Sequence, residues 1–544
     1  MSPTMDSILR DHVSLSVSCI DRIYLNGYMP KLQTAGQLCT FLRDHLGYPI
    51  PSPALFQPMH DRFVDGVRAF ARERNVPVVK FEGGQRKDDI ASGYRAAFGK
   101  SEGVVFIGVA QEKALSFKAH KANRPGAGLF DFSRQSVWVN HYYFYVQDKE
   151  WGPAFVKVCS YLSGRQAYLP YTVRVCLNGH EWVKQQLLHA GIRFESLDNG
   201  FLSCEDPQRL QATCDALGPQ DVQRFFDRWL QRLPWPLSPA DRAAGYDHRL
   251  AIWQLEVSLT QVFDRPVQGR HFFNALIREN LDLGRPDRVS LLFPTKLTRA
   301  TPAPARGYRT RVITHKVSPS LHVEYKHSHV KQYFKEERAL RTETTINDPG
   351  DFYSLKGLAH LPFLRGAGEQ VNRKLLEVER LSQDCVLSQD SLDHLQRPTL
   401  EAGRRAPGLR FGDPRVMALL QAICGFVHLP QGFRNRDLRL QVAALLGLDP
   451  SAYTSGSMSY DLRRLRLKGL IHRIPGTTRY TVTTYGLRVA LFYTKLYLRI
   501  LRPGWAALVD SAEAFPKPLR QAFAALQAEI EKLAANANLE VKTA

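Results

Sequence analysis

The chain lacks the residue patterns that mark several common classes of protein. Its 544 residues include only eight cysteines, which are scattered, with no Cys-x-x-Cys pair and no paired Cys/His spacing. We therefore expect no structural zinc, and we expect reduced, mostly buried thiols. No apolar run approaches the roughly 20 residues that a membrane-spanning helix needs, and the first residues lack the basic-then-apolar form of a secretory signal. We expect a cytoplasmic protein with no membrane partner.

Nucleotide-binding fingerprints and internal repeats are also missing. Gly83–Asp89 lies between an expected strand and an expected helix, but its glycines lack the spacing of either phosphate-binding motif. We find no repeat with a period of roughly 20–50 residues and no long low-complexity tract. Because 44% of the residues are hydrophobic, the chain can bury substantial cores. Its length predicts three or four domains.

Positive charge is in excess, and it is concentrated in two segments. The chain has 73 Lys and Arg against 52 Asp and Glu, a net charge of +21. Residues 405–502 contain 16 basic and 4 acidic residues, and residues 296–341 contain 11 and 3, so these segments carry +12 and +8. Local clusters of this sign bind polyanions, because the release of counterions from phosphates drives association. A basic face that only keeps the protein soluble is the alternative.

The order of apolar segments predicts an α+β fold, in which a mixed-sheet α/β body with a helical insertion is followed by a C-terminal winged helix-turn-helix. In the insertion, residues 221–233 and 250–279 are expected to be helical. A tail helix over residues 518–534 would either pack on the body or pair with a second copy of the chain in a homodimer. The expected divisions are an N-terminal α+β segment (1–75), an α/β domain (76–235), a helical region with a basic β-hairpin (236–400), a winged-helix domain (405–502) and a C-terminal tail (503–544).

Residues 433–483 show the order of elements of a winged helix-turn-helix. Asn435 is placed to cap a first helix, and Gly447 is placed to end it. A second helix with basic residues on its outer face follows a serine-rich cap. Two short strands, residues 471–474 and 479–482, then flank a Pro-Gly turn and resemble a wing.

This arrangement fits the major groove of double-stranded DNA, with the β-ribbon on the DNA backbone. A winged helix that docks a protein is the alternative. The residues expected to contact DNA are Arg434, Arg436, Ser459, Tyr460, Arg463, Arg464, Arg466 and Lys468 from the helices, and Arg473 and Arg479 from the wing.

A candidate reaction site lies on two expected strands in the other basic segment. By strand alternation Lys331, Tyr333 and Lys335 share one face, and Arg341 and Glu343 share one face of the next strand. If the register joins these faces, the cations would hold a phosphate, the carboxylate would take a metal ion or a proton, and the phenol would be a nucleophile. This chemistry suits a metal-dependent DNA endonuclease or nickase that uses Mg²⁺ or Mn²⁺. A solvent-exposed ladder of ion pairs is the alternative.

Two further motifs are incomplete. His327-Ser328-His329 is spaced like a two-histidine metal pair, but it has serine where nickases have a bulky apolar residue. Gln111-Glu112-Lys113 follows an Asp pair at about the interval of restriction-type nuclease cores, but glutamine stands in the acidic place. Polar residues at the strand ends 140–145 and 178–182 could face a cleft.

Several runs resemble a large uncharacterised bacterial protein family: Asp21–Asn26, Leu340–Asp348 and Gly432–Leu438. This resemblance covers most of the chain and implies no assigned activity. The Lys-x-Tyr-x-Lys strand and the following Leu-Arg-x-Glu are similar to a strand pair of rolling-circle replication initiators. The chain departs from those proteins because it lacks their His-hydrophobic-His strand.

These features together predict a DNA-binding protein of a mobile element or a plasmid-type DNA transaction, which binds its own site and cuts or initiates replication there. A non-enzymatic winged-helix transcriptional regulator, whose body senses a ligand or a partner, is a second hypothesis. A third is an RNA-binding protein that stacks bases on the aromatic strand Tyr142–Tyr145.

Overall fold

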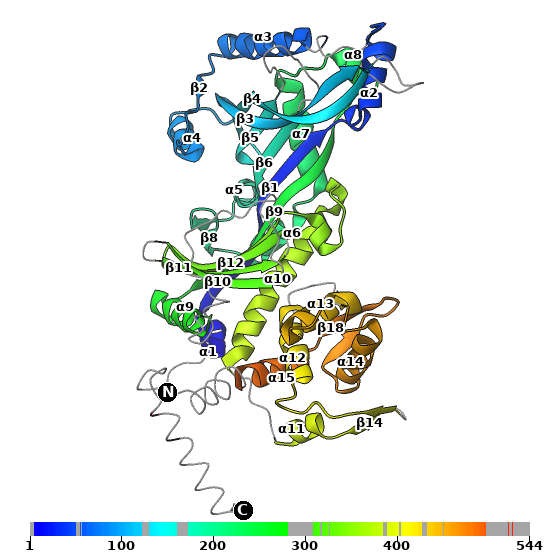
Figure 1. The fold of residues 1–544 in the computed structure, drawn as a ribbon. Coiled ribbons are helices and arrows are strands. Elements are labelled where there is room, and N and C mark those ends of the chain that lie inside the picture. The colour runs from blue at the N-terminus through cyan, green and yellow to red at the C-terminus, as the bar shows by residue number, and fades with distance from the viewer. Residues whose placement is uncertain are drawn as a thin grey trace, which may run out of the picture. The chain divides into compact units, whose positions relative to one another are not determined.

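The computed structural model describes residues 5–496 with gaps, and beyond them Gln521 and Ala525. The chain divides into a large unit, residues 1–280 with 291–373, and a C-terminal unit, residues 281–290 with 374–544 (Figure 1). Apart from Gln521 and Ala525, the expected tail helix at 518–534 lies outside the described residues, as does the homodimer that depends on it. The gaps within the described range are 51–54, 56, 122–129, 160–171, 281–307, 316–317, 326, 384–388, 402–403, 427–431 and 450.

An 11-stranded mixed sheet is the framework of the large unit, in agreement with the expected α+β class. The strand order is β10-β11-β12-β13-β9-β1-β6-β5-β4-β3-β2, and every pair is antiparallel except β2 with β3. The strands are β1 (Val13–Tyr28), β2 (Val78–Lys80), β3 (Gly103–Lys121), β4 (Phe130–Asp148), β5 (Gly152–Cys159), β6 (Thr172–Asn178), β9 (Arg249–Phe263), β10 (Tyr308–His315), β11 (Ser318–Tyr325), β12 (Ser328–Lys335) and β13 (Ala339–Ile346).

The helices of the large unit precede, connect and follow these strands. A short hairpin, β7 (Phe194–Ser196) with β8 (Phe201–Cys204), follows helix α5. The helices are α1 (Met5–Asp11), α2 (Ala35–Thr40), α3 (Gln57–Glu73), α4 (Lys87–Ala96), α5 (Gly179–His189), α6 (Pro207–Ala216), α7 (Pro219–Arg232), α8 (Pro239–Ala243), α9 (Pro266–Asn280) and α10 (Leu361–Gln383). None of the described helices is both long and apolar enough to span a bilayer.

The central strand of the sheet comes from the N-terminal segment. β1 pairs with β6 on one side and with β9 on the other. The domain boundaries expected at residues 75 and 235 therefore fall inside one unit, because strands from all three expected divisions share the same sheet. Pairing between distant strands, which local sequence patterns do not show, decides this organisation.

The helix expected over residues 250–279 is a strand in its first half. β9 occupies Arg249–Phe263, and only α9 is helical. The buried residues Ile252, Leu255 and Leu259 are three and four positions apart, which is the spacing of a helix face. The β1–β9 pairing has register shifts, and such bulges interrupt the alternation of a strand. The bulges thus explain why this strand imitates helical periodicity.

One face of the sheet is apolar and covered by helices. Ile23 and Val257 are fully buried there. A side chain at Gly27 would lie 3.6 Å from the Phe226 ring of α7, and one at Gly368 of α10 would lie 2.9 Å from Val257. α7 and α10 therefore pack directly on β1 and β9.

The opposite face is polar near the middle of the sheet. Glu256 and Ser258 of β9 alternate with the buried Leu255 and Val257, and they point to this side. Helix α5 lies here, since a Cβ at Gly179 would come within 2.2 Å of the Ile20 carbonyl oxygen of β1. Only glycine permits this close approach at the start of α5. The approach places the first residues of α5 against the sheet.

The C-terminal unit contains the expected helices and strands between residues 433 and 483. A three-stranded sheet has the order β16-β18-β17, and Gly447 ends α13 with a positive φ of 69°. The elements are α11 (Gln389–Gln396), β14 (Thr399–Glu401), β15 (Arg404–Ala406), α12 (Pro414–Phe426), β16 (Phe433–Arg434), α13 (Asn435–Leu446), α14 (Ser455–Leu467), β17 (Ile471–Arg473), β18 (Arg479–Val482) and α15 (Thr484–Leu496).

The cap of α13 differs from the expected one. Arg434 is the N-cap residue, and its backbone N–H donates to the Asp437 carboxylate at 2.9 Å. Asn435 is the first helical residue, so its expected role as the cap is wrong. Its side-chain Nδ2 instead donates to Ser459 Oγ at 2.9 Å and to the Ser455 carbonyl at 3.1 Å. This residue fixes α13 to the start of α14.

Candidate functional site

The two strands of the predicted reaction site pair in the register that the hypothesis requires. Lys331 of β12 lies opposite Glu343 of β13, and Tyr333 lies opposite Arg341. The Tyr333 hydroxyl donates to Glu343 Oε1 at 2.8 Å, and Arg341 Nε donates to the same oxygen at 2.7 Å. Lys331 Nζ lies 4.2 Å from the centroid of the Tyr333 ring. These contacts connect the four side chains in the order Lys331, Tyr333, Glu343, Arg341.

Arg341 is the centre of a buried network on the polar face of the sheet. Its side chain is 0% exposed. Nη2 donates to Asp21 Oδ2 at 2.6 Å, and Nη1 donates to the Asn199 carbonyl at 2.5 Å. With Glu343 on Nε, the guanidinium is held by two carboxylates and a carbonyl. The expectation that Arg341 binds a phosphate is wrong, because the group is already paired and closed off from solvent.

Lys335 is also buried. Its Nζ pairs with Asp198 Oδ2 at 3.1 Å. Asp198 and Asn199 belong to the loop between β7 and β8, which lies over this part of the sheet. Strand alternation predicts the shared face correctly, but it does not predict that a hairpin from residues 194–204 covers the face. The expected accessible surface is thus limited to Lys331, Tyr333 and Glu343, which are partly exposed.

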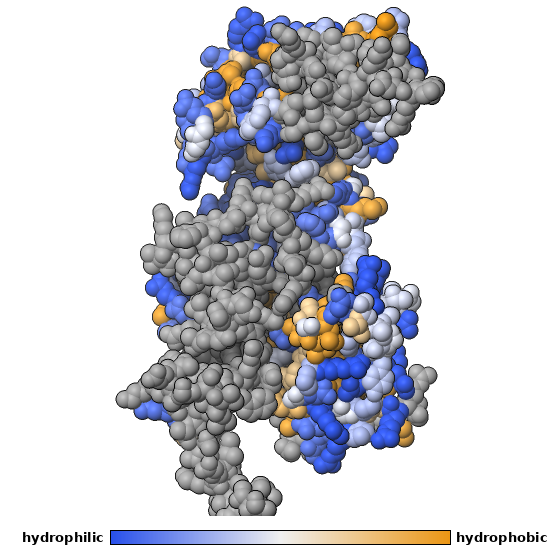
Figure 2. All heavy atoms as spheres, viewed as in Figure 1, coloured by the Kyte–Doolittle hydropathy of each residue, from blue (hydrophilic) through white to orange (hydrophobic). Residues whose placement is uncertain are grey.

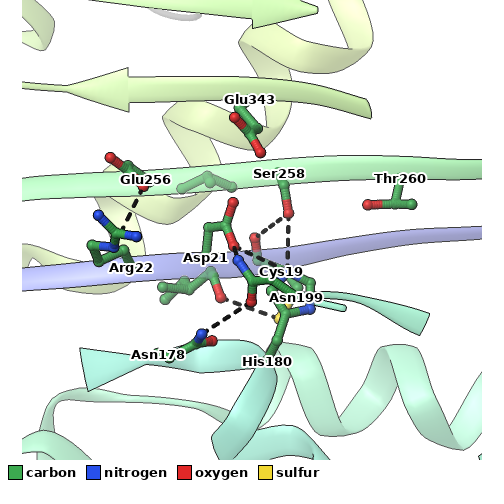
Figure 3. A network of polar contacts seen from close by, with 12 residues as sticks. Cys19, Asp21, Arg22, Asn178, His180, Asn199, Glu256, Ser258, Thr260 and Glu343 are labelled. Atoms are coloured by element: carbon green, nitrogen blue, oxygen red, sulfur yellow. Dashed lines mark hydrogen bonds and ion pairs between the residues drawn. The ribbon is translucent and has the colours of Figure 1, made fainter. Parts of the chain in front are cut away.

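Asp21, His180 and Asn199 complete the network (Figure 3), and of these only His180 lies in a segment, 178–182, that was expected to face a cleft. Asp21 lies in β1 at a register shift between Ile20 and Arg22, and it is buried. His180, near the start of α5, has Nε2 3.1 Å from Ser258 Oγ and 3.5 Å from Asp21 Oδ1. Asn199 Nδ2 also donates to Asp21 Oδ1. A lone aspartate in the apolar run of β1 was the available signal for this site.

The ionisation of these groups argues against a tyrosine nucleophile. Burial raises the pKa of the Tyr333 hydroxyl, and the neighbouring Glu343 carboxylate raises it further. Burial opposes the charge of Arg341, but Asp21 and Glu343 outweigh it and raise the pKa of the guanidinium. Burial lowers the pKa of His180. Tyr333 therefore stays protonated and serves as a donor to Glu343, whereas a nucleophile needs an activated, deprotonated form.

The metal-binding motifs do not assemble in the part of the chain that the structure describes. No group of three or more His, Cys, Asp and Glu side chains is arranged there to hold a metal ion. His327, the first histidine of the incomplete pair, donates its backbone N–H to Asp351 Oδ2 at 3.1 Å, and its Nδ1 lies 3.2 Å from Asp351 Oδ1.

A second polar cluster surrounds Glu112 on β3. Lys87 Nζ lies 2.6 Å from Oε1, Lys157 Nζ lies 2.5 Å from Oε2, and the Tyr143 hydroxyl donates to Oε1. Burial would raise the pKa of Glu112, but the two lysines outweigh it and lower the pKa to about 2. Glu112 is thus a paired carboxylate, and its partners are these two lysines rather than its sequence neighbour Lys113.

The aromatic strand proposed to stack RNA bases is not accessible. Tyr142, Tyr143 and Tyr145 are all buried. Tyr145 stacks on Phe106 at a centroid distance of 4.4 Å, and Phe63 packs edge-on against Tyr142 at 5.5 Å. These rings form core contacts, so the stacking platform of the RNA hypothesis is wrong.

The predicted DNA-contact residues of the C-terminal unit separate into an accessible group and a buried group. Arg464 and Lys468 are buried, so the expectation that they face DNA is wrong. Residues 461, 464, 465 and 468 share the inner side of α14, and a count of basic residues does not separate this side from the outer one. The exposed residues are Arg434, Arg436, Ser459, Tyr460, Arg463 and Arg473, and the partly exposed ones are Arg466 and Arg479.

The buried side of α14 is fixed by Asp461. Arg415 of α12 donates to Asp461 Oδ2 from Nε at 2.9 Å and from Nη2 at 2.7 Å, and the Tyr453 hydroxyl donates to the same oxygen. Arg464 Nη1 donates to Asp461 Oδ1 at 3.3 Å. The helix therefore has a defined orientation, with Ser459 and Arg463 turned outward. Figure 2 shows hydrophilic side chains over much of the visible face of this unit.

The chain was compared with protein-family models, curated proteins and solved structures. No protein-family model, curated protein or solved structure matches the chain. The resemblances to an uncharacterised bacterial family and to rolling-circle initiators stay predictions.

Proposed function

We propose that the protein binds double-stranded DNA through its C-terminal unit, which acts as a winged helix-turn-helix. The element order α12, β16, α13, α14, β17, β18 and the strand order β16-β18-β17 support this assignment. In such modules the second helix of the pair enters the major groove, and the wing contacts the backbone. Here α14 would be the recognition helix.

The exposed cations at the start of α13 and along α14 carry the proposal. Arg434 and Arg436 are exposed at the start of α13, and Arg463 is exposed on the outer side of α14. Asn435 joins the two helix starts through Ser459. Cations on rigid, adjoining helix ends can hold phosphates and base edges in a fixed register.

The test is binding of the full chain to a pool of random-sequence duplexes, followed by selection of a preferred site. Arg463→Ala should weaken binding to that site by about 1–3 kcal/mol if the guanidinium meets a base edge. Arg193→Ala on the large unit removes the same charge from an exposed side chain, and it is the matched control. Equal affinities of Arg463→Ala and Arg193→Ala would contradict the proposed recognition helix.

For the large unit, we propose a role within a mobile-element or plasmid-type DNA transaction. The pairing of Arg341 and Lys335 and the protonated state of Tyr333 favour a non-enzymatic regulator over strand cleavage. Strand cleavage through the partly exposed Glu343 is the competing proposal. Incubating supercoiled and single-stranded DNA with the protein and Mg²⁺ or Mn²⁺ distinguishes them. Cleavage that Glu343→Gln abolishes would support an enzyme, and binding without cleavage would support a regulator.

A further inference from the structure

The hairpin β14–β15 lies beside α14, and its base is fixed by the two buried cations of that helix. Lys468 is 2% exposed. Its Nζ donates to the carbonyls of His394 at 2.5 Å and Arg397 at 2.6 Å, just before β14. Arg464 Nη2 donates to the Gly408 carbonyl at 2.8 Å, just after β15. Lys468 therefore binds the segment that enters the hairpin, and Arg464 binds the segment that leaves it.

The two chain segments at the base of this hairpin are in direct backbone contact. The Leu409 N–H donates to the Leu395 carbonyl at 2.7 Å, and the Tyr493 hydroxyl donates to the Leu409 carbonyl at 3.1 Å. A Cβ at Gly408 would lie 1.8 Å from the Gln396 carbonyl oxygen, so only glycine fits there. Burying a lysine is costly unless its ammonium is hydrogen-bonded, and here the hairpin base supplies the acceptors. The hairpin is thus held rigidly to α14.

The hairpin and α13 lie on opposite flanks of the outer face of α14. Successive helical residues are about 100° apart. Ser459 and Arg463 point outward, and Asn435 of α13 touches Ser459 at one edge of this face. Arg464 and Lys468, which hold the hairpin, lie past the other edge, beyond Tyr460. In Figure 1 the β14 hairpin and the wing reach outward on the same side, with α14 between them.

The side of the hairpin that faces away from the unit carries a cation and a large apolar side chain. Arg405 is exposed and lies directly opposite Leu400, which is 75% exposed. Ala406, which points the other way, is buried. At the base, the Arg397 side chain is 76% exposed and pairs with the partly exposed Asp393 at 3.2 Å, a surface contact that a phosphate can replace. Arginine binds DNA phosphates, and exposed apolar side chains next to it contact sugars and groove walls.

We propose that the hairpin β14–β15, with Arg397 at its base, is a second DNA-binding arm. It binds the duplex backbone on the flank of α14 opposite to α13. This inference rests on the proposed function of the C-terminal unit. The partner is the same duplex that α14 enters, and Arg405 and Arg397 meet its phosphates. The two buried cations of α14 would then act on DNA indirectly, by orienting the arm.

The test compares the wild-type chain with the double variant Arg397→Ala/Arg405→Ala on a duplex that the wild-type chain has selected from a random-sequence pool. The variant should bind about 10-fold more weakly, and the slope of log affinity against log salt should become shallower by about two, one for each lost phosphate contact. Hydroxyl-radical footprinting should lose protection on one flank only, while protection at the recognition groove is kept. Both side chains are exposed, so thermal unfolding should match that of wild type.

The outcomes separate the two proposals. Arg193→Ala on the large unit removes one exposed charge and is the control for non-specific charge effects; it should change neither footprint nor slope. If the wild-type chain binds duplex with a dependence on Arg463, but the double variant keeps the full footprint, the arm is overturned and the proposed function stands. If the wild-type chain binds no duplex, both are overturned.

Discussion

The sequence predicts that Arg341 in the large unit and Arg463 in the C-terminal unit both bind nucleic acid, but the structure buries Arg341 and exposes Arg463. Arg341 is enclosed by Asp21, Glu343 and a carbonyl. Arg463 is exposed on α14, while its neighbour Arg464 is buried against Asp461. A buried arginine with two carboxylate partners holds a structure together, and an exposed one next to other cations is available to a polyanion.

The comparison shows what a count of basic residues misses. Segments 296–341 and 405–502 both carry excess positive charge. In the first, Arg341 and Lys335 are neutralised by Asp21 and Asp198, which lie far away in sequence. In the second, exposed arginines remain beside the buried ones. The partners that a basic residue meets in the fold, rather than the density of basic residues in the sequence, decide whether its charge is available to phosphates.

Removal of the Arg341 guanidinium should have the largest effect. Arg341→Met leaves the buried Asp21 and the neighbouring Glu343 without their cation, which should lower the free energy of unfolding of the large unit by about 3–5 kcal/mol. Urea unfolding followed by tryptophan fluorescence measures this loss. A variant as stable as wild type would show that the Arg341 network does not stabilise the fold. Arg341 and Arg463 would then not differ in their contribution to stability.

Arg464→Ala should destabilise the C-terminal unit by about 1–3 kcal/mol, because it leaves Gly408 and Asp461 with fewer donors. Arg463→Ala should change stability by less than about 0.5 kcal/mol, as expected for an exposed residue. Thermal unfolding of the two variants makes a direct comparison of adjacent positions. Equal losses of stability would mean that α14 does not have the inner and outer sides described above.

Low pH should reduce the free energy of unfolding of the large unit. Burial lowers the pKa of His141 to about 4, and the positive charge of Lys157 lowers it in the same direction. An unfolded histidine takes up its proton below about pH 6.5, whereas the folded one does not until about pH 4, so stability falls as the pH drops through this window. At pH 5 the loss should be about 2 kcal/mol. His141→Gln cannot titrate and should flatten this part of the pH profile in urea unfolding; an unchanged profile would contradict the assignment.

Lys331→Ala should have a much smaller effect on stability than Arg341→Met. Lys331 is partly exposed, and its described contact is with the face of the Tyr333 ring. Such a contact contributes about 0.5–1 kcal/mol at an exposed site. The variant therefore provides a baseline for Arg341→Met on the neighbouring strand. A loss as large as that of Arg341→Met would show that the whole face, and not the arginine, is the structural element.

Elements fixed by local chemistry could be predicted from the sequence, and those fixed by distant partners could not. Gly447 ends α13 as expected, and the alternation of Lys331, Tyr333 and Glu343 correctly predicts their shared face. The bulged strand β9 imitates a helix, because its buried residues are not strictly alternate. His180 and Asp21 meet Arg341 from 161 and 320 positions away, so no local pattern could join them.

The place of β1 in the sheet has a consequence for how the chain is made. β1 leaves the ribosome long before one of its neighbours, β9, which ends at Phe263. Until β9 has been translated, the edge of β1 that pairs with it has unpaired backbone N–H and C=O groups, and such an open strand edge promotes aggregation. A fragment that starts at residue 76 would lack the middle strand, and one that stops before residue 249 would leave that strand open. Expression trials should therefore keep residues 13–263 together.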